Sequence, residues 1–374
     1  MYYKYIIQMV NEELLPINIK KEDSITPSLS FNASGWLYVF QIGVVTMLQE
    51  ATELGNTKLY GTSAGAAAAT AIALDYPGQI AAEEMCKQEE QVRGNFKHMV
   101  RIMKNSIEKL TPDNASQLVN GRLNVVCTEL ISLRSPKYKT TLFNKFGSRR
   151  DVIDVLSATS HIPILGGFTP YRYKEHLLYD GLFTDSHPLS HDKTPFKISW
   201  THNCQCGCTK DRYNNPRVFA PRARMPIRWC FLPPDKTTLR LIFWHGYCEA
   251  RDVLLRPDFP RHILKLKSGV FKKNNNDSCV NKEIYVDELS RTPISLVSDV
   301  DKDKILLHKD EICFEIRRRV NVVEDRWSGI TGLIRSFVVM LAIIFPCIDL
   351  MWLARPLIEG GRYKDEKEYY NSVF

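Results

Sequence analysis

The spacing of apolar and polar residues predicts alternating strands and helices between residues 28 and 180. Runs rich in Val, Leu, Ile, Thr and aromatic residues predict strands at 28–31, 58–60, 122–130, 139–146 and 176–179. Apolar residues at helical spacing predict helices at 36–53, 64–73, 79–93, 96–110 and 150–158. This alternation predicts an α/β fold with a largely parallel sheet.

Two of the predicted helices have a distinctive composition. From 36 to 53 apolar residues occupy most positions, which indicates a helix buried on most sides. The segment 64–73 is rich in alanine, whose helix propensity and small side chain favour close packing. Both helices are therefore expected to pack against the sheet.

Composition divides the chain into five segments. After residue 190, Pro, Asn, Arg and Lys become frequent and the regular alternation is lost. The predicted segments are an N-terminal segment (1–27), an α/β domain (28–190), a basic extension without a predicted fold (191–330), a membrane-associated helix or hairpin (331–358) and a polar tail (359–374).

An apolar stretch at 336–354 is the candidate membrane segment. Arg335 and Arg355 flank it, and its length is close to that needed to cross a bilayer. Pro346 and Asp349 interrupt it, so it is expected to span the bilayer, to lie in the interface or to turn back. A helix buried in a protein core is the alternative.

Charge and cysteine content indicate the environment. The 374 residues include 50 Lys and Arg against 42 Asp and Glu, a formal charge of +8, which favours anionic surfaces. No nucleic-acid signature is present, so a membrane leaflet is the expected partner and a nucleic acid is not. Because the first residues do not form a secretory signal, the ten cysteines are expected to be reduced and the domain to face the cytoplasm.

The segment Gly61-Thr62-Ser63-Ala64-Gly65 matches G-x-S-x-G, in which a serine lies on a sharp turn between a strand and a helix. Glycines keep side chains out of the strained turn, and the helix that follows points its first amides at a developing oxyanion. A predicted strand precedes this segment and a predicted helix follows it. Ser63 is therefore predicted to be a nucleophile, with a structural turn as the alternative.

Asp180 is the predicted base for this serine. It ends a predicted strand, and Gly181 allows the chain to turn sharply after it. The ends of parallel strands meet at one edge of a sheet, where the turn presents Ser63, so Asp180 could accept the serine proton directly. The alternatives are a histidine base, with His187 or His191 as candidates, and an ordinary strand-exit turn.

The predicted oxyanion donors are the amides of Ala33, Ser34, Gly35 and Trp36, together with that of Ala64. The first four follow one predicted strand and open the next predicted helix, so their amides could converge with the Ala64 amide on a substrate carbonyl. A plain connecting turn is the alternative.

A cluster of possible metal ligands lies in the basic extension. His202, Cys204, Cys206 and Cys208 are close in sequence, but C-x-C-x-C lacks the paired C-x-x-C spacing of structural zinc sites. A reduced surface loop is therefore expected there, and neither a metal nor another cofactor is predicted.

Taken in order, these segments resemble the patatin-like phospholipase family, most closely the branch that includes adipose triglyceride lipase and adiponutrin. The resemblance covers about residues 28–189 and continues weakly to about residue 247. It is carried by Ser30-Phe31, Gly35, Leu37, Gly43-Val44, Tyr60 to Gly65, Ser160 to Pro163, Tyr179-Asp180-Gly181 and Asp185 to Leu189. It implies a three-layer α/β/α fold in which a serine–aspartate dyad, here Ser63 and Asp180, cleaves acyl esters of phospholipids or neutral glycerolipids without a metal.

Three positions depart from that family's pattern. Ala33 and Tyr38 replace glycines of the oxyanion loop, and Leu182 replaces a glycine after the aspartate. A positive φ at Ala33, or a Tyr38 ring in the acyl space, would misplace the oxyanion donors. The expected function is a lipid hydrolase at a membrane or lipid-droplet surface, and no protein activator is inferred. The alternatives are a catalytically weak regulator docked on lipid and a lipid acyltransferase.

Overall fold

The computed structural model describes residues 26–92, 99–132, 137–163, 165–189, 194–201, 215–271, 291–294, 297, 302, 305 and 308–326. The apolar stretch 336–354 and the His/Cys cluster at 202–208 lie outside these residues. Within the described part, no helix is long and apolar enough to cross a bilayer. The same part holds no group of three or more His, Cys, Asp or Glu residues placed to bind a metal ion.

An eight-stranded mixed sheet forms the centre of the molecule, in the order β5-β6-β3-β2-β1-β7-β8 with β4 beside β3. The strands are β1 (Ser28–Phe31), β2 (Lys58–Thr62), β3 (Leu123–Ser132), β4 (Lys137–Phe143), β5 (Tyr171–Tyr173), β6 (His176–Asp180), β7 (Phe196–Ile198) and β8 (Val218–Phe219). Strands β1, β2, β3, β7 and β8 pair in parallel with one another. Strands β4, β5 and β6 pair antiparallel. The predicted α/β class with a mostly parallel sheet is confirmed.

The longest strand, β3, brings two strand ends together. Val126 pairs with both β2 and β4, whereas Cys127 pairs with both β4 and β6. Strand β4 therefore lies along one edge of β3, and β2 and β6 share the other edge. These two strands run toward each other and end on adjacent rungs, with Thr62 opposite Val126 and Asp180 opposite Cys127.

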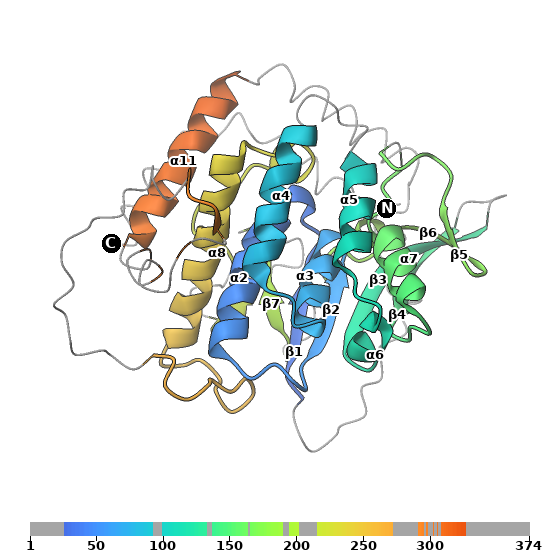
Figure 1. Cartoon of the computed structure of the whole chain (residues 1–374), viewed down its shortest axis with the longest axis horizontal. Helices are drawn as coiled ribbons and strands as arrows, with labels where there is room; N and C mark the ends of the chain where they lie inside the picture. The colour runs from blue at the N-terminus through green and yellow to red at the C-terminus, as the bar shows by residue number, and fades with distance from the viewer. Residues whose placement is uncertain are drawn as a thin grey trace, which may run out of the picture.

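Most helices lie in front of the strands in the view of Figure 1. They are α2 (Tyr38–Ala51), α3 (Ala64–Ala73), α4 (Gly78–Val92), α5 (Met99–Leu110), α6 (Ala115–Val119), α7 (Arg149–Thr159) and α8 (Lys236–Leu255), with α11 (Lys309–Arg326) beside α8. Short 3₁₀ turns form η1 (Gly35–Leu37), η3 (Gly181–Phe183) and η4 (Ile227–Cys230). All five predicted helices are present with small shifts at their ends, and the third layer of an α/β/α arrangement stays a prediction.

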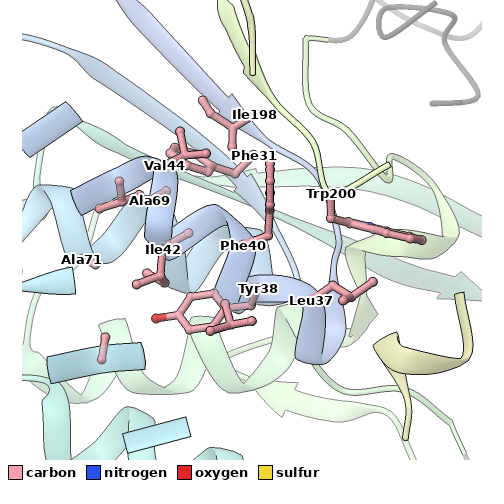
Figure 2. Close-up of a cluster of buried hydrophobic side chains, with 14 of the residues drawn as sticks. Phe31, Leu37, Tyr38, Phe40, Ile42, Val44, Ala69, Ala71, Ile198 and Trp200 are labelled. Carbon is pink, nitrogen blue, oxygen red and sulfur yellow. The ribbon is translucent and has the colours of Figure 1, made fainter. Parts of the chain in front are cut away.

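Helix α2 is buried on almost every side, as its sequence predicts. All of its residues except Gln49 and Glu50 are buried. Figure 2 shows Phe40 and Ile42 of this helix packed with Phe31 of β1. The predicted 36–53 helix begins later than expected because residues 35–37 first form the turn η1.

Helix α8 packs on α2 with its backbone in close contact. A Cβ atom on Gly246 would lie 2.1 Å from the Phe40 carbonyl oxygen, and one on Gly43 would lie 2.0 Å from that of Phe243. Helix α8 was not predicted, although Asp235 marks its start by accepting a hydrogen bond from the Thr238 amide at 3.0 Å. The basic extension expected from residue 191 thus supplies β7, β8 and α8 to the same sheet and core.

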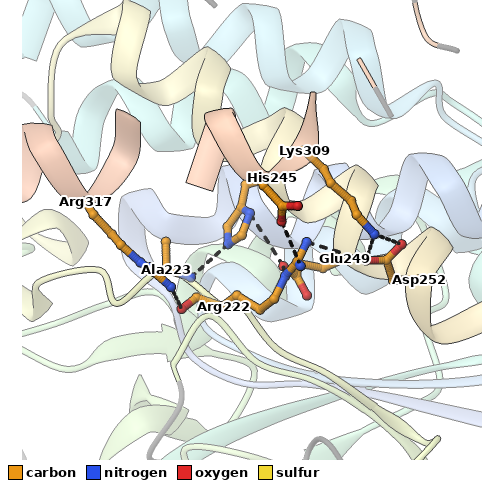
Figure 3. Close-up of polar contacts among 8 residues, drawn as sticks. Arg222, Ala223, His245, Glu249, Asp252, Lys309 and Arg317 are labelled. Carbon is orange, nitrogen blue, oxygen red and sulfur yellow. Dashed lines mark hydrogen bonds and ion pairs between the residues drawn. The ribbon is translucent and has the colours of Figure 1, made fainter. Parts of the chain in front are cut away.

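Charged side chains fasten α11 to α8 (Figure 3). Lys309 of α11 binds Asp252 of α8 at 2.6 Å, and Arg222 binds both Glu249 of α8 at 2.5 Å and Asp310 of α11 at 3.2 Å. The Ala223 amide donates a hydrogen bond to Nε2 of the buried His245 at 3.2 Å. The ion pairs of Lys309 and Arg222 thus hold α11 against α8.

Candidate active site

Ser63 lies on the sharp turn between β2 and α3. Its backbone has φ = 55° and ψ = −132°, a conformation that non-glycine residues adopt rarely and that is common at functional sites. The Ser63 amide donates a hydrogen bond to Thr159 Oγ1 at 2.9 Å, and this hydroxyl donates to the Val126 carbonyl at 2.5 Å. The turn is therefore anchored to both α7 and β3.

The glycines of the motif permit two close approaches. A Cβ atom on Gly61 would lie 2.5 Å from Ala66 Cα, and one on Gly65 would lie 2.4 Å from the Asn32 carbonyl oxygen. Larger residues would push α3 away from β2 and from the loop that follows β1. The sequence expectation for the two glycines matches this geometry.

The Ser63 hydroxyl donates a hydrogen bond to Asp180 Oδ2 at 2.6 Å. The other carboxylate oxygen of Asp180 accepts the Leu182 amide at 2.8 Å, and the Asp180 amide donates to the His161 carbonyl at 3.0 Å. Leu182, which departs from the family pattern, thus still orients the aspartate through its amide.

The structure brings Ser63 and Asp180 together, but the predicted reason was wrong. Parallel strands were expected to end at one edge, whereas β6 is antiparallel to β3. The two residues meet because β2 and β6 approach each other head-on along the same edge of β3. The apolar pattern of a strand does not indicate its direction.

Burial controls the acidity of Asp180. Its side chain has no solvent exposure, which disfavours the charged form and raises its pKa to about 7. The hydrogen bonds from Ser63 and Leu182 favour the carboxylate and limit this rise. A carboxyl group that titrates near neutrality is suited to accept and return a proton.

His187, one of the two histidines considered as an alternative base, contacts the Ser30 carbonyl rather than Ser63. His187 is buried, and its Nε2 lies 3.2 Å from the Ser30 carbonyl oxygen. His191 lies outside the described residues. The Ser63 hydroxyl is instead paired with Asp180.

The loop after β1 lies beside Ser63 but does not offer every predicted donor. The Ala33 amide donates to the Ser186 carbonyl at 2.8 Å, so the expectation that it serves as an oxyanion donor is wrong. Within the described part of the chain, the amides of Ser34, Gly35 and Ala64 make no hydrogen bond. These three amides remain candidate oxyanion donors, and Trp36 lines the adjoining cavity.

The glycine at position 35 is required by both conformation and space. Gly35 has φ = +51°, and a Cβ atom there would lie 2.0 Å from the Cys230 carbonyl oxygen of η4. Ala33 is not among the described residues with positive φ, so alanine at that position introduces no such strain. The alanine at position 33 therefore does not misplace the loop through a strained backbone.

A buried polar network holds the loop that follows β1 against α2. Gln41 of α2 donates through Nε2 to the Asn32 carbonyl at 2.9 Å and to Asn32 Oδ1 at 2.7 Å. Its Oε1 accepts the Ser34 hydroxyl at 3.0 Å, and Asn32 Nδ2 donates to Ser199 at 3.0 Å. Sequence reasoning missed this role, although a glutamine within a nearly all-apolar helix was the signal available.

A largely apolar cavity of about 200 Å³ opens beside Ser63. The residues that line it include Ser34, Gly35, Trp36, Ala64, Leu182, Trp200, Ile227 and Phe231. Tyr38 forms part of its wall, and burial raises the pKa of the Tyr38 hydroxyl. The site therefore combines a serine–aspartate pair with apolar space for a substrate.

Comparisons with known proteins show which sequences this chain is similar to. Residues 29–191 match the family model for patatin-like phospholipases. The chain is 25% identical over 256 residues to omega-hydroxyceramide transacylase of Mus musculus, covering 63% of this chain and 42% of that protein. It is 25% identical over 243 residues to human 1-acylglycerol-3-phosphate O-acyltransferase PNPLA3, covering 60% and 49%.

A third relative extends the aligned region. The chain is 24% identical over 304 residues to patatin-like phospholipase domain-containing protein 2 of Mus musculus, covering 75% of this chain and 60% of that protein. The chain spans about half the length of the curated relatives it matches. The family match covers the strand–serine–helix turn, the loop after β1 and the aspartate that ends β6. Residues 29–191, which hold these three segments, are thus similar to patatin-like phospholipases.

Proposed function

We propose that this protein is a serine lipid acyl hydrolase, a phospholipase A or acylglycerol lipase, that uses Ser63 as nucleophile and Asp180 as base. The observation that carries the proposal is the 2.6 Å hydrogen bond from the Ser63 hydroxyl to a fully buried carboxylate. Ser63 lines an apolar cavity suited to a lipid tail.

In the first half of the reaction, Ser63 Oγ attacks the ester carbonyl carbon while Asp180 accepts the hydroxyl proton. The carbonyl oxygen becomes an oxyanion, which the amides of Gly35 and Ala64 stabilise. The tetrahedral intermediate collapses, the C–O bond breaks, and the leaving alcohol takes the proton from Asp180. The products are an acyl-Ser63 enzyme and a lysolipid or smaller glyceride.

In the second half, Asp180 accepts a proton from water as the water oxygen attacks the acyl-enzyme. The same amides hold the second oxyanion. When this intermediate collapses, Ser63 Oγ leaves and regains a proton from Asp180, and a free fatty acid is released. No cofactor takes part in the proposed cycle.

Acyl transfer to an alcohol is the second candidate function. Two relatives are named as a transacylase and an O-acyltransferase, which favours this alternative. It uses the same serine and aspartate, and the only change is that a lipid hydroxyl replaces water in the second half. Product analysis with an added lysolipid acceptor separates the two.

The proposed setting is the cytoplasmic side of a membrane or a lipid droplet. The substrates are esters embedded in lipid, and the chain carries a formal charge of +8 that favours anionic surfaces. A catalytically weak protein that docks on lipid as a regulator would share this setting. Turnover distinguishes the regulator from the enzyme.

The test incubates the purified protein with a panel of phospholipids and triacylglycerols and measures released fatty acid. We expect hydrolysis by the wild type and by Ser116→Ala, a control on α6 away from the site, and none by Ser63→Ala. Equal release by Ser63→Ala would overturn the proposal. Binding to lipid without release of fatty acid from any substrate would favour the docking regulator.

A further inference from the structure

Helix α3 presents one uncovered face, and this face lines the cavity. Every residue of α3 is buried except Ala64 and Ala67, and both line the cavity. Ala71 and Leu74 continue the same line of cavity residues at helical spacing. The cavity therefore follows α3 from the residue after Ser63 to its C-terminal end, which is roughly 15 Å at 1.5 Å per residue.

Helices α4 and α5 also line the cavity. Each contributes residues at a spacing of three or four, as α3 does, so one face of each helix follows the cavity. The apolar members are Ala81 and Met85 from α4, and Val100, Ile102, Met103, Ile107 and Leu110 from α5. The space between the three helices is thus elongated and mainly apolar.

Polar contacts join α4 to α5 beside this space. Gln88 of α4 donates a hydrogen bond to the Ser106 hydroxyl of α5. Lys109 of α5 binds Glu84 of α4 at 3.1 Å. Because Glu84, Gln88 and Ser106 also line the cavity, these contacts tie α4 to α5 along its wall.

We propose that the acyl chain of the substrate lies along α3 and that Ala67 and Ala71 set the chain length that the site accepts. This inference rests on the proposed function and names the part of the substrate that the cavity holds. An acyl chain fits because the space is elongated, apolar and starts at the nucleophile, whereas a charged head group would lose its hydration there.

The two alanines act at different depths. Ala67 lies four residues beyond Ser63, about 6 Å along the helix axis, and Ala71 lies twice as far. A leucine at either position would fill the space that an alanine leaves open. A leucine at position 67 would therefore obstruct all but short chains, whereas one at position 71 would obstruct only long chains.

The experiment measures kcat/KM for p-nitrophenyl butyrate, octanoate and palmitate. For Ala67→Leu we expect losses of about tenfold or more on octanoate and palmitate, with butyrate nearly unchanged. For Ala71→Leu we expect the loss on palmitate alone. Ile80→Phe, which adds bulk at an exposed position of α4 outside the cavity, should keep the wild-type profile.

A uniform loss on all three esters, or an unchanged profile in both leucine variants, would overturn the inference. Thermal unfolding of each variant checks that it folds, and Ala67→Val and Ala71→Val replace any leucine variant that does not. If the wild type hydrolyses butyrate through Ser63 but the leucine variants do not change chain preference, only this inference fails.

A binding measurement covers the case in which no ester is hydrolysed. In the Ser63→Ala background, palmitate should displace a fluorescent fatty acid, and Ala67→Leu should weaken that displacement about tenfold or more. Unchanged displacement would reject the acyl channel, independently of whether the proposed function holds.

Discussion

The chemistry of Asp180 follows from the position of one side chain in a sheet. Strand β6 ends beside Ser63, so the carboxyl group receives two hydrogen bonds and no water contact. Burial raises its pKa to about 7 against an ordinary value of 3.8. At neutral pH the group therefore exchanges a proton readily in either direction.

This pKa predicts the pH dependence of the reaction. The base must be ionised to accept the Ser63 proton, so kcat/KM should rise with pH and reach half its maximum near pH 7. Stopped-assay rates on a soluble ester between pH 5 and pH 9 measure the profile. A profile that is flat across this range would contradict a buried aspartate as base.

The free energy of unfolding should fall as pH rises, whereas the activity should increase. The folded state holds the Asp180 proton more tightly than the unfolded chain, so the associated stability is present below pH 4 and is lost as pH rises through 7. The loss amounts to at most ~4 kcal/mol. Asp180→Asn, which cannot ionise, should gain stability relative to wild type between pH 5 and pH 8, as measured by urea unfolding.

Gln41 offers a second test at this scale. Gln41→Met keeps the size of the side chain but removes its hydrogen bonds to Asn32 and Ser34. We expect kcat to fall about tenfold to a hundredfold because the oxyanion loop loses its position. Gln49→Met, on the same helix but bonded to the Tyr76 carbonyl, is the matched control and should leave kcat within about twofold. Equal effects of the two variants would contradict the role of Gln41.

Sequence identified Ser63 and Asp180 because each carries a local signal, a motif in one case and a strand end followed by glycine in the other. It misassigned Ala33, whose amide is occupied by the carbonyl of Ser186. Such a contact joins residues more than a hundred positions apart and leaves no local pattern. The role of Gln41 is different, because its partners Asn32 and Ser34 are near in sequence and a polar residue within an apolar helix was a signal that sequence reasoning missed.

At the scale of elements, most strands and helices before residue 180 were predicted from their apolar spacing, whereas the short elements α6 and β5 were missed. The direction of β6 and the shared edge of β3 were not predictable, because apolar spacing reports burial and not strand orientation. Strands β7 and β8 were missed because they are only three and two residues long. Helix α8 was missed although Asp235 gave a start signal.

The contact between α2 and α8 predicts a large effect of a small change. In Gly246→Ala the new methyl group would lie 2.1 Å from the Phe40 carbonyl oxygen, so the two helices must separate. We expect the free energy of unfolding to fall by about 3 kcal/mol or more, measured by urea denaturation. Gly55→Ala, where the methyl group meets no atom within 4 Å, is the control and should be nearly neutral.

At the scale of the whole molecule, the site combines the sheet and helices of the first half of the described chain with the turn η4 of the second half. The turn that holds Ser63 and the strand that holds Asp180 come from the region that matches the family model. Helix α8 and the turn η4, which fixes Gly35, come from beyond it. Truncation at residue 191 would therefore remove support for the oxyanion loop.

The net charge predicts how the protein meets lipid. Vesicles that contain an anionic phospholipid should bind the protein more tightly than phosphatidylcholine vesicles, and added salt should weaken this preference because it screens the charges. Co-sedimentation measures both effects. Equal binding to the two kinds of vesicle at low salt would show that charge does not guide the protein to lipid.

The most direct test of the account is to label the protein with a fluorophosphonate probe and to locate the label by peptide mass spectrometry. The account predicts rapid labelling of the wild type at Ser63, none in Ser63→Ala, and labelling slowed by about a thousandfold or more in Asp180→Asn. Labelling at another residue, or an Asp180→Asn variant that reacts as fast as the wild type, would contradict the serine–aspartate pair.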